Sequence, residues 1–246
     1  MDIIRHHFNT IISTNTWGKE HAHEFPRDKI TLITADEQTG GRGRFNRRWE
    51  SPANQNIYAS FCFLIDKERK DTGNIPQVLA LSTTKVLQKM SFRPELKWPN
   101  DILLSKKKVA GILAETVSFP EGMWMIAGIG VNINLSSDYL NKIDRPATSL
   151  YLEKHQNFDI EDVLLQLQKE FCNDLELFFK KGFAHFLPLY RQCCHADSKQ
   201  LIRFHDNRQI WEGHLHSINE DGSLSLELPS GQIKTFVAGE ILFANE

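Results

Sequence analysis

The sequence predicts a main domain of α/β or α+β class followed by a small β-barrel of SH3-like kind. Strand-like runs rich in Ile, Phe and Leu dominate the first half of the chain, and a long amphipathic helix comes after them. Alternating strands separated by turn signals fill the C-terminal segment. The chain has 246 residues, which at about 150 residues per domain corresponds to roughly 1.6 domains. One large domain with a small one attached fits that ratio.

The first half of the chain is predicted to contain mostly strands. Residues 29–37 and 56–65 are dense in β-branched and aromatic side chains, which favour strands. Residues 75–90 carry apolar side chains at helical spacing and predict a helix. Further short strands are predicted at 96–98, 102–104, 109–117 and 123–133.

A long helix is predicted from Asp159 to Lys181. Its apolar side chains recur every three or four residues and form one stripe for burial: Ile160, Leu164, Leu167, Phe171, Leu175 and Phe178. Asp159 is a suitable N-cap, and Gly182 is suited to end the helix. A second helix is expected from Phe183 to about Cys193.

The last part of the chain predicts the small barrel. Alternating strand patterns occur at 201–204, 209–218, 223–228 and 232–237. Asp221-Gly222 and Pro229-Ser230-Gly231 mark turns between them. We therefore expect a main domain over residues 1–195 and a barrel over 196–246.

Composition excludes several classes of protein. The 29 Lys and Arg nearly balance the 31 Asp and Glu, so a chain-wide polyanion binder is disfavoured. The N-terminus lacks the apolar core of a signal peptide, and no apolar run reaches the length of a membrane span. The four cysteines form no CxxC pair and no evident disulfide framework. We expect a cytoplasmic protein without a membrane partner.

A Gly/Arg-rich segment lies between the first two predicted strands. Four arginines fall between Arg42 and Arg48, interleaved with Gly41 and Gly43. Guanidinium groups suit carboxylate and phosphate oxygens, and glycine lets the backbone approach a ligand closely. On composition alone, an RG-type nucleic-acid patch or a solvated loop explains the segment equally well.

A second polar segment, Lys97-Trp98-Pro99-Asn100-Asp101, joins two short strands. Its turn presents two polar side chains at the edge of a strand. The three lysines at 106–108 predict a hairpin turn, where a lysine is usually solvated. Lys108 differs because it adjoins an apolar strand that contains Gly111.

Two further segments combine small and polar residues. Gly128 and Gly130 inside a predicted strand indicate a ligand or another backbone close by, and Asn132 offers an amide for recognition. Ser13-Thr14-Asn15 has a simple structural explanation as a helix N-cap.

Taken together, these four segments resemble the biotin protein ligases. They occur in the order and spacing of that family, across residues 13–134. The matching residues are Ser13-Thr14-Asn15, Gln38 with Gly41-Arg42-Gly43-Arg44 through Trp49, Lys97 through Asp101 with Lys108 through Leu113, and Gly128 through Asn132. The resemblance implies an α+β fold, with a mixed β-sheet, flanking helices and a C-terminal SH3-like barrel.

The resemblance also implies a two-step reaction. Biotin's carboxylate attacks the α-phosphate of ATP, with Mg²⁺ as the ion, to give biotinyl-5′-AMP and pyrophosphate. A lysine amine of a biotin carboxyl carrier protein then attacks the acyl carbon and releases AMP. The chain holds no Met-Lys-Met acceptor hairpin, so the acceptor lysine is expected in trans.

By family position, each matching residue has an expected role. The catalytic group comprises Lys108, Arg42, Arg44 and Asp101. Biotin is expected to contact Ser13, Thr14, Asn15, Gln38, Gly41, Arg42, Arg44, Lys108 and Gly111. ATP is expected to contact Arg42, Arg47, Trp49, Asn100 and Asn132. Asp101 is our hypothesis for the group that orients or deprotonates the acceptor amine, and no metal ligand is assigned.

The sequence departs from the family in three places. Asn46 replaces a frequent third glycine in the Arg/Gly segment, and Ala244 stands where some members carry arginine. The first motif begins at residue 13, so we expect no winged-helix domain and no nucleic-acid partner. A homodimer formed through a sheet edge stays open. The alternatives are a lipoate or octanoate ligase of the same fold, or a nucleic-acid-binding module that uses the Arg/Gly segment.

Overall fold

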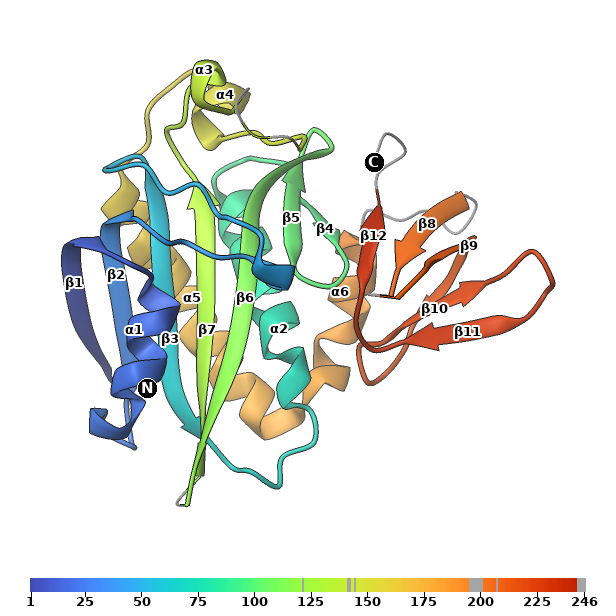
Figure 1. The fold of residues 1–246 in the computed structure, drawn as a ribbon, viewed down its shortest axis with the longest axis horizontal. Coiled ribbons are helices and arrows are strands. Elements are labelled where there is room, and N and C mark those ends of the chain that lie inside the picture. The colour runs from blue at the N-terminus through green and yellow to red at the C-terminus, as the bar shows by residue number, and fades with distance from the viewer. Residues whose placement is uncertain (121, 141–142, 144, 195–200, 207, 243–246) are drawn as a thin grey trace.

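A seven-stranded mixed sheet forms the centre of the main domain (Figure 1). The computed structural model describes residues 1–120, 122–140, 143, 145–194, 201–206 and 208–242. Its strands are β1 (Ile3–Ile11), β2 (Ile30–Gln38), β3 (Asn56–Ile65), β4 (Glu95–Lys97), β5 (Asp101–Leu104), β6 (Lys107–Phe119) and β7 (Gly122–Asn132). They lie in the order β1-β2-β3-β7-β6-β5-β4, and β1 pairs with β2 in parallel while the other neighbours are antiparallel. The expected mixed sheet is confirmed.

The strand β1 was missed by the sequence analysis. It is an edge strand, and none of its nine residues is fully buried. Its sequence, IIRHHFNTI, therefore lacks the apolar density that marked β2 and β3.

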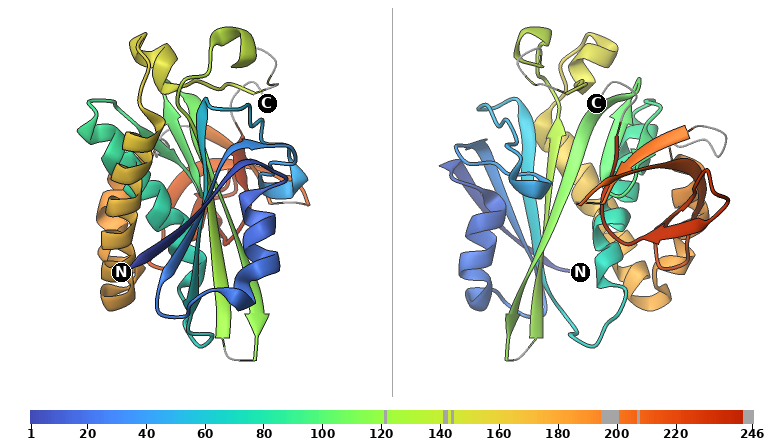
Figure 2. Two further views of the ribbon diagram at one scale, coloured as in Figure 1. Left: turned by 90° about the vertical axis from the view of Figure 1, so that its left-hand side faces the viewer. Right: turned by 45° about the vertical axis from the view of Figure 1, so that its right-hand side comes forward.

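Helices cover both faces of the sheet (Figure 2). They are α1 (Thr14–His21), α2 (Ile75–Lys89), α3 (Ser137–Leu140), α4 (Leu150–Lys154), α5 (Ile160–Lys181) and α6 (Leu187–Cys193). Short 3₁₀ turns are η1 (Ala22–Glu24), η2 (Arg44–Asn46), η3 (Thr72–Asn74) and η4 (Phe183–His185). The helix α1 lies on one face, and α2 and α5 lie on the other.

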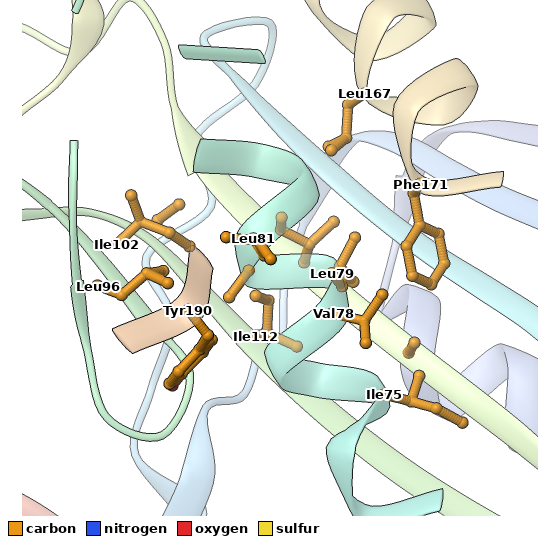
Figure 3. Packing of buried hydrophobic residues seen from close by; sticks show 14 of the residues in the cluster. Ile75, Val78, Leu79, Leu81, Leu96, Ile102, Ile112, Leu167, Phe171 and Tyr190 are labelled. Atoms are coloured by element: carbon orange, nitrogen blue, oxygen red, sulfur yellow. The ribbon is translucent and has the colours of Figure 1, made fainter. Parts of the chain in front are cut away.

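The larger core lies between the sheet, α2 and α5 (Figure 3). Leu79 of α2, Ile112 of β6 and Phe171 of α5 belong to this one buried cluster. Covered on both sides, α2 is apolar around most of its circumference, whereas α5 shows the single stripe expected of a helix at the surface. The expected N-cap of α5 is confirmed, because the Asp159 carboxylate accepts a hydrogen bond of 3.1 Å from the Asp162 backbone N–H.

A five-stranded antiparallel sheet follows at the C-terminus. Its strands are β8 (Leu201–His205), β9 (Ile210–Ile218), β10 (Leu224–Glu227), β11 (Ile233–Phe236) and β12 (Glu240–Leu242), in the order β11-β10-β9-β8-β12. Four were predicted, whereas β12 was missed because it has only three residues. The expected domain boundary at residues 195 and 196, together with Ala244, lies outside the described residues.

The small β domain docks beside β4, β5 and α6 (Figure 1). The carbonyl of Gly222 accepts hydrogen bonds from the side-chain N–H groups of Gln77 and Trp98, each 2.9 Å long. The Trp98 and Phe204 rings lie 5.7 Å apart. The buried apolar residues of the main domain and of the small β domain form one cluster. This docking brings β12 next to the Arg/Gly segment.

The composition disfavours membrane-spanning helices and a disulfide framework. Among the helices of the described ranges, none is both long and apolar enough to cross a membrane. All four cysteine thiols are free.

Candidate active site

The Arg/Gly segment crosses in front of the sheet (Figure 1). It lines a cavity of about 500 Å³. Its floor comes from β6 and β7, and its rim from the start of α1, residues 98–101 and β12. Thirteen of the fourteen residues that the sequence analysis placed in the site line this cavity. Four distant segments therefore meet at one place.

One end of the cavity is a neutral hydrogen-bonding network. The Gln38 side-chain oxygen accepts from the Thr14 backbone N–H at 2.9 Å and from the Thr14 hydroxyl at 3.2 Å. Behind Thr14, the buried Ser60 hydroxyl lies 2.8 Å from Thr14 Oγ1 and 2.6 Å from Asn15 Oδ1. Ser13 caps α1 by accepting from the Thr16 backbone N–H. The N-cap explanation of this triplet is thus confirmed, and Thr14 also faces the cavity.

Asn15 is held firmly by its neighbours. Its Nδ2 donates to the Leu113 carbonyl at 2.9 Å and to the Glu115 carboxylate at 3.0 Å, while its Oδ1 faces Ser60. A Cβ on Gly128 would lie 2.0 Å from that Oδ1. Gly128 is therefore needed to admit the Asn15 side chain, where the sequence analysis expected a ligand or another backbone.

Trp49 lies over the glycines of the cavity floor. A Cβ on Gly130 would lie 2.4 Å from the indole ring, and one on Gly111 would lie 2.7 Å from the Lys108 Cε. The indole N–H of Trp49 is buried without a hydrogen-bond partner. Lys108 Nζ lies 5.3 Å from the centre of a Trp49 ring. The two glycines thus admit a flat aromatic surface beside a lysine.

Lys108 forms an ion pair with Asp101, with Nζ 2.7 Å from Oδ1. Both line the cavity, and the Lys108 side chain is 30% exposed. The hairpin between β5 and β6 brings them together, because Asp101 pairs with Gly111 across the two strands. The expected hairpin turn is present at Ser105 and Lys106, both at positive φ, but Lys107 and Lys108, which were expected in the turn, already belong to β6.

The arginines of the Arg/Gly segment contact the chain itself. Arg42 donates to the Thr16 hydroxyl at 3.2 Å and lies 3.6 Å from the Glu115 carboxylate. Arg44 donates to the Asn100 side-chain oxygen at 3.3 Å and to the Gly239 carbonyl at 2.9 Å.

The other two arginines of the segment each pair with a carboxylate. Arg47 pairs with Glu240 at 2.5 Å, whereas Arg48 pairs with Glu50 and is 76% exposed. Three of the four arginines, Arg48 being the exception, are therefore held at the cavity by the rest of the fold.

Two charged groups at this end have shifted pKa values. Burial lowers the pKa of the Arg44 guanidinium, and the nearby Asp101 and Glu240 carboxylates partly oppose that shift. Burial opposes ionisation of Glu240, but the hydrogen bond and charge of Arg47, together with the charges of Lys97 and Arg145, outweigh it and lower the pKa of this carboxyl group. The cavity end is thus a desolvated, charged environment near neutral pH.

Three expected site residues hold the local structure. Asn132 donates to the Thr148 carbonyl at 3.0 Å, and Asn100 donates to the Ile112 carbonyl. Gly41 lies behind the cavity wall, where a Cβ would meet Ser51 Oγ at 2.6 Å, and it is the expected residue that does not line the cavity. The left-handed backbone in this segment occurs at Phe45, with φ 57°.

The cavity also has lining residues that the sequence analysis did not assign to the site. They include Glu50, Leu113, Ile143, Arg145 and Glu240. Glu240 lies in the sequence Gly239-Glu240-Ile241, which resembles a turn of the biotin protein ligases; this resemblance is the one sequence signal for Glu240, which the structure places at the start of β12. Nothing in the local sequence marks Arg145. In the part of the chain that the structure describes, no group of three or more His, Cys, Asp or Glu side chains is placed to hold a metal ion.

The sequence is similar to those of known protein ligases. The model of the Biotin/lipoate A/B protein ligase family matches residues 8–134. The bifunctional ligase/repressor BirA of Bacillus spizizenii is 30% identical over 230 residues, covering 88% of this chain and 68% of that protein. The biotin–[acetyl-CoA-carboxylase] ligase of Paracoccus denitrificans is 29% identical over 220 residues, covering 86% of this chain and 89% of that protein.

A solved structure shares the whole architecture. The biotin protein ligase from Aquifex aeolicus, in complex with biotin and ATP, superimposes with a TM-score of 0.81 at 29% identity. The match covers 98% of this chain and 97% of that chain, so it includes both the main sheet and the small β domain. The chain belongs to the biotin/lipoate A/B protein ligase family.

Proposed function

We propose that this protein is a biotin–[biotin carboxyl-carrier protein] ligase, which uses ATP to attach biotin to a lysine of a carrier domain through biotinyl-5′-AMP. The observation that carries the proposal is the asymmetry of one cavity. A neutral hydrogen-bonding end at Thr14 and Gln38 adjoins a cationic end at Lys108, Arg44 and Arg47. Biotin has a neutral ureido ring at one end and a carboxylate at the other, so its two ends match those of the cavity.

The neutral end is expected to select biotin over fatty acids. The Thr14 hydroxyl and the Gln38 amide supply both donors and acceptors inside a cavity. Thr14 and Gln38 already bond to each other, and Gln38 also donates to Ser51, so a lipoyl or octanoyl chain would bury only their remaining hydrogen-bonding capacity, which the ureido ring can use. Ser13 lies at the same end of the cavity. Asn15 accepts a hydrogen bond from the Ser60 hydroxyl, which also contacts Thr14, and so helps to hold Thr14 in place.

The cationic end is expected to bring two anions together. A carboxylate and a triphosphate repel each other, so cations must hold them at the distance for attack. Lys108 is the group proposed to contact the biotin carboxylate and the α-phosphate oxygens. Arg44 and Arg47 are proposed to bind the same anions, with Arg42 approaching from the Thr16 side, while Trp49, Asn100 and Asn132 form the nucleotide end of the cavity.

Magnesium is proposed to arrive with ATP as the ion of the triphosphate. Mg²⁺ commonly uses one or two carboxylates together with substrate phosphates. Asp101 and Glu240 are carboxylates at the cationic end of the cavity, and both are engaged by cations. Such a site fits an ion bound mainly by phosphate oxygens.

Asp101 is proposed to act in the second step. The carboxylate of Asp101 forms an ion pair with Lys108. Once Lys108 turns to a phosphate, Asp101 becomes available to accept a hydrogen bond from the incoming lysine amine, whose reference pKa of about 10.4 leaves it protonated at neutral pH.

Replacing Asp101 should therefore slow transfer more than adenylation. We expect Asp101→Asn to lower the rate of transfer from preformed biotinyl-5′-AMP to a carrier lysine by about 10²-fold, a typical size for general-base assistance. The difference in transfer rate between Asp101→Asn and the unchanged protein should become smaller as the pH rises toward the pKa of the acceptor lysine, because more of that amine is then already deprotonated. Transfer at the full rate and with an unchanged pH profile would remove Asp101 from this role.

The acceptor is a biotin carboxyl carrier domain, and we propose no nucleic-acid partner. The arginines that suggested a nucleic-acid patch are turned toward Thr16, Asn100, Gly239 and Glu240, and Arg48 alone is mostly exposed. Retention on RNA that falls steeply with salt would support the alternative. We also propose a homodimer formed through a sheet edge, and the cytoplasm as the compartment of a protein with four free thiols.

ATP–pyrophosphate exchange tests the proposed function. Purified protein with Mg²⁺ should exchange pyrophosphate into ATP when biotin is added, and much more slowly with lipoate or octanoate. Exchange driven by lipoate or octanoate instead would keep the fold and change the substrate. Absence of exchange with all three acids would overturn the ligase proposal.

A further inference from the structure

Arg145 is a cation of the cavity that neither its neighbours in sequence nor any motif identifies. It lies in the segment between α3 and α4 and lines the cavity. Its Nη1 lies 3.1 Å from Glu240 Oε1 in β12, and its side chain is 38% exposed. The guanidinium therefore has access to the cavity.

The chain beside Arg145 is fixed to the cavity floor. Lys108 N–H donates to the Pro146 carbonyl at 2.9 Å, and Thr148 N–H donates to the Lys108 carbonyl at 2.9 Å. Asn132 adds a third hydrogen bond, to the Thr148 carbonyl at 3.0 Å. Arg145 thus projects from backbone that is held on β6, next to the proposed catalytic lysine.

The charges around Glu240 do not balance. The two oxygens of its carboxylate take Arg145 and Arg47, and Arg44 donates to the adjacent Gly239 carbonyl. Asp101, the other carboxylate nearby, is paired with Lys108 at 2.7 Å. Arg47 and Arg145 therefore share one carboxylate, and the Arg44 guanidinium lies beside them on neutral oxygens of Gly239 and Asn100. Partly desolvated like charges repel each other, so an anion with several charges would stabilise this cluster.

We infer that Arg145 binds the phosphates of the nucleotide, together with Arg44 and Arg47, and that Glu240 holds Arg145 and Arg47 in position for this contact. The inference deepens the proposed function, because it assumes that the cavity takes ATP. It assigns the phosphate site to three separate segments of the chain, namely the Arg/Gly segment, the segment before α4, and β12.

A purely structural role for Arg145 predicts different behaviour. If Arg145 only fastened β12 to the main domain, its loss would weaken every ligand of the cavity and lower stability. If it contacts phosphate, its loss should weaken nucleotides in proportion to their phosphates and leave adenosine unaffected. The number of phosphates on the ligand is therefore the variable to change.

The experiment measures binding of ATP, ADP and adenosine to the full chain by calorimetry, for Arg145→Gln and Arg145→Lys. Since hydrogen bonds between charged groups contribute about 1.5–3 kcal/mol, we expect Arg145→Gln to weaken ATP by roughly tenfold or more, with adenosine unchanged. Arg145→Lys should recover part of the loss, because it keeps the charge but not the planar fork.

The matched control is Arg5→Gln. Arg5 also pairs its guanidinium with a glutamate, Glu161, and is similarly exposed at 31%, but it lies on β1, away from the cavity. Its variant should bind ATP as the unchanged protein does. Equal weakening of ATP and adenosine by Arg145→Gln, unchanged ATP binding, or failure of the unchanged protein to bind ATP would each overturn the inference. Phosphate-dependent binding without biotin-dependent exchange would overturn only the proposed substrate.

Discussion

Lys108→Gln should reduce biotin-dependent pyrophosphate exchange by about 10²–10³-fold, the size expected when one preorganised charged donor is removed from a transition state. Lys108 Nζ is placed 2.7 Å from Asp101 and beside Trp49, at the cationic end of the cavity. Negative charge develops on the α-phosphate oxygens in the transition state. Among the described residues, no other lysine lines the cavity and could take the place of Lys108. Initial rates at saturating biotin and ATP measure the effect directly.

The adjacent turn supplies the control for this prediction. Lys107 is exposed and does not line the cavity, so Lys107→Gln changes the same charge one residue away. It should leave exchange unchanged. Because Lys108→Gln also leaves Asp101 without its partner, a second variant, Lys108→Gln with Asp101→Asn, separates the two effects. If the single variant exchanged at more than a third of the normal rate, Lys108 would not stabilise the transition state.

Gly128→Ala should weaken biotin binding strongly and also lower stability. Its Cβ would lie 2.0 Å from Asn15 Oδ1, and the Asn15 side chain is fixed by Leu113, Glu115 and Ser60, so it cannot yield easily. Forcing one carbon into a tight core costs about 1–3 kcal/mol. Displacing Asn15 would also disturb Thr14 through Ser60, so we expect KM for biotin to rise by roughly tenfold or more, because buried hydrogen-bonding groups lose their partners.

Gly73→Ala is the matched control for Gly128→Ala. No heavy atom lies within 4 Å of the Cβ it would add. It should leave both the thermal midpoint and KM for biotin unchanged. Gly128→Ala with a normal KM for biotin would show that the Asn15 network does not shape the biotin site.

The fold was predictable where buried residues form a regular apolar pattern in the sequence. The buried strands β2 and β3 and the single stripe of α5 have apolar patterns that local rules read correctly. The edge strand β1 alternates little and buries no residue fully, so its pairing with β2 carries no local signal. Likewise, β12 is defined by its partner β8 and not by its own three residues.

Only the site residues that belong to the four sequence motifs were predictable. The segments from Ser13 to Asn132 were marked by composition and spacing, and the structure brings them to one cavity. Arg145 was not marked, because its contact with Glu240 joins residues 95 positions apart in the sequence. The glycines of β7 were noticed for a sound reason, close approach, but their neighbours are the side chains of Asn15 and Trp49.

The most direct test of the proposed function is the covalent product. A purified biotin carrier domain, incubated with this protein, biotin, ATP and Mg²⁺, should gain the mass of one biotinyl group on a single lysine. The same mixture without ATP should leave the carrier unchanged, whereas preformed biotinyl-5′-AMP should restore the product without ATP. A carrier that stays unmodified in the complete mixture, with no biotinyl-5′-AMP formed there, would contradict the account.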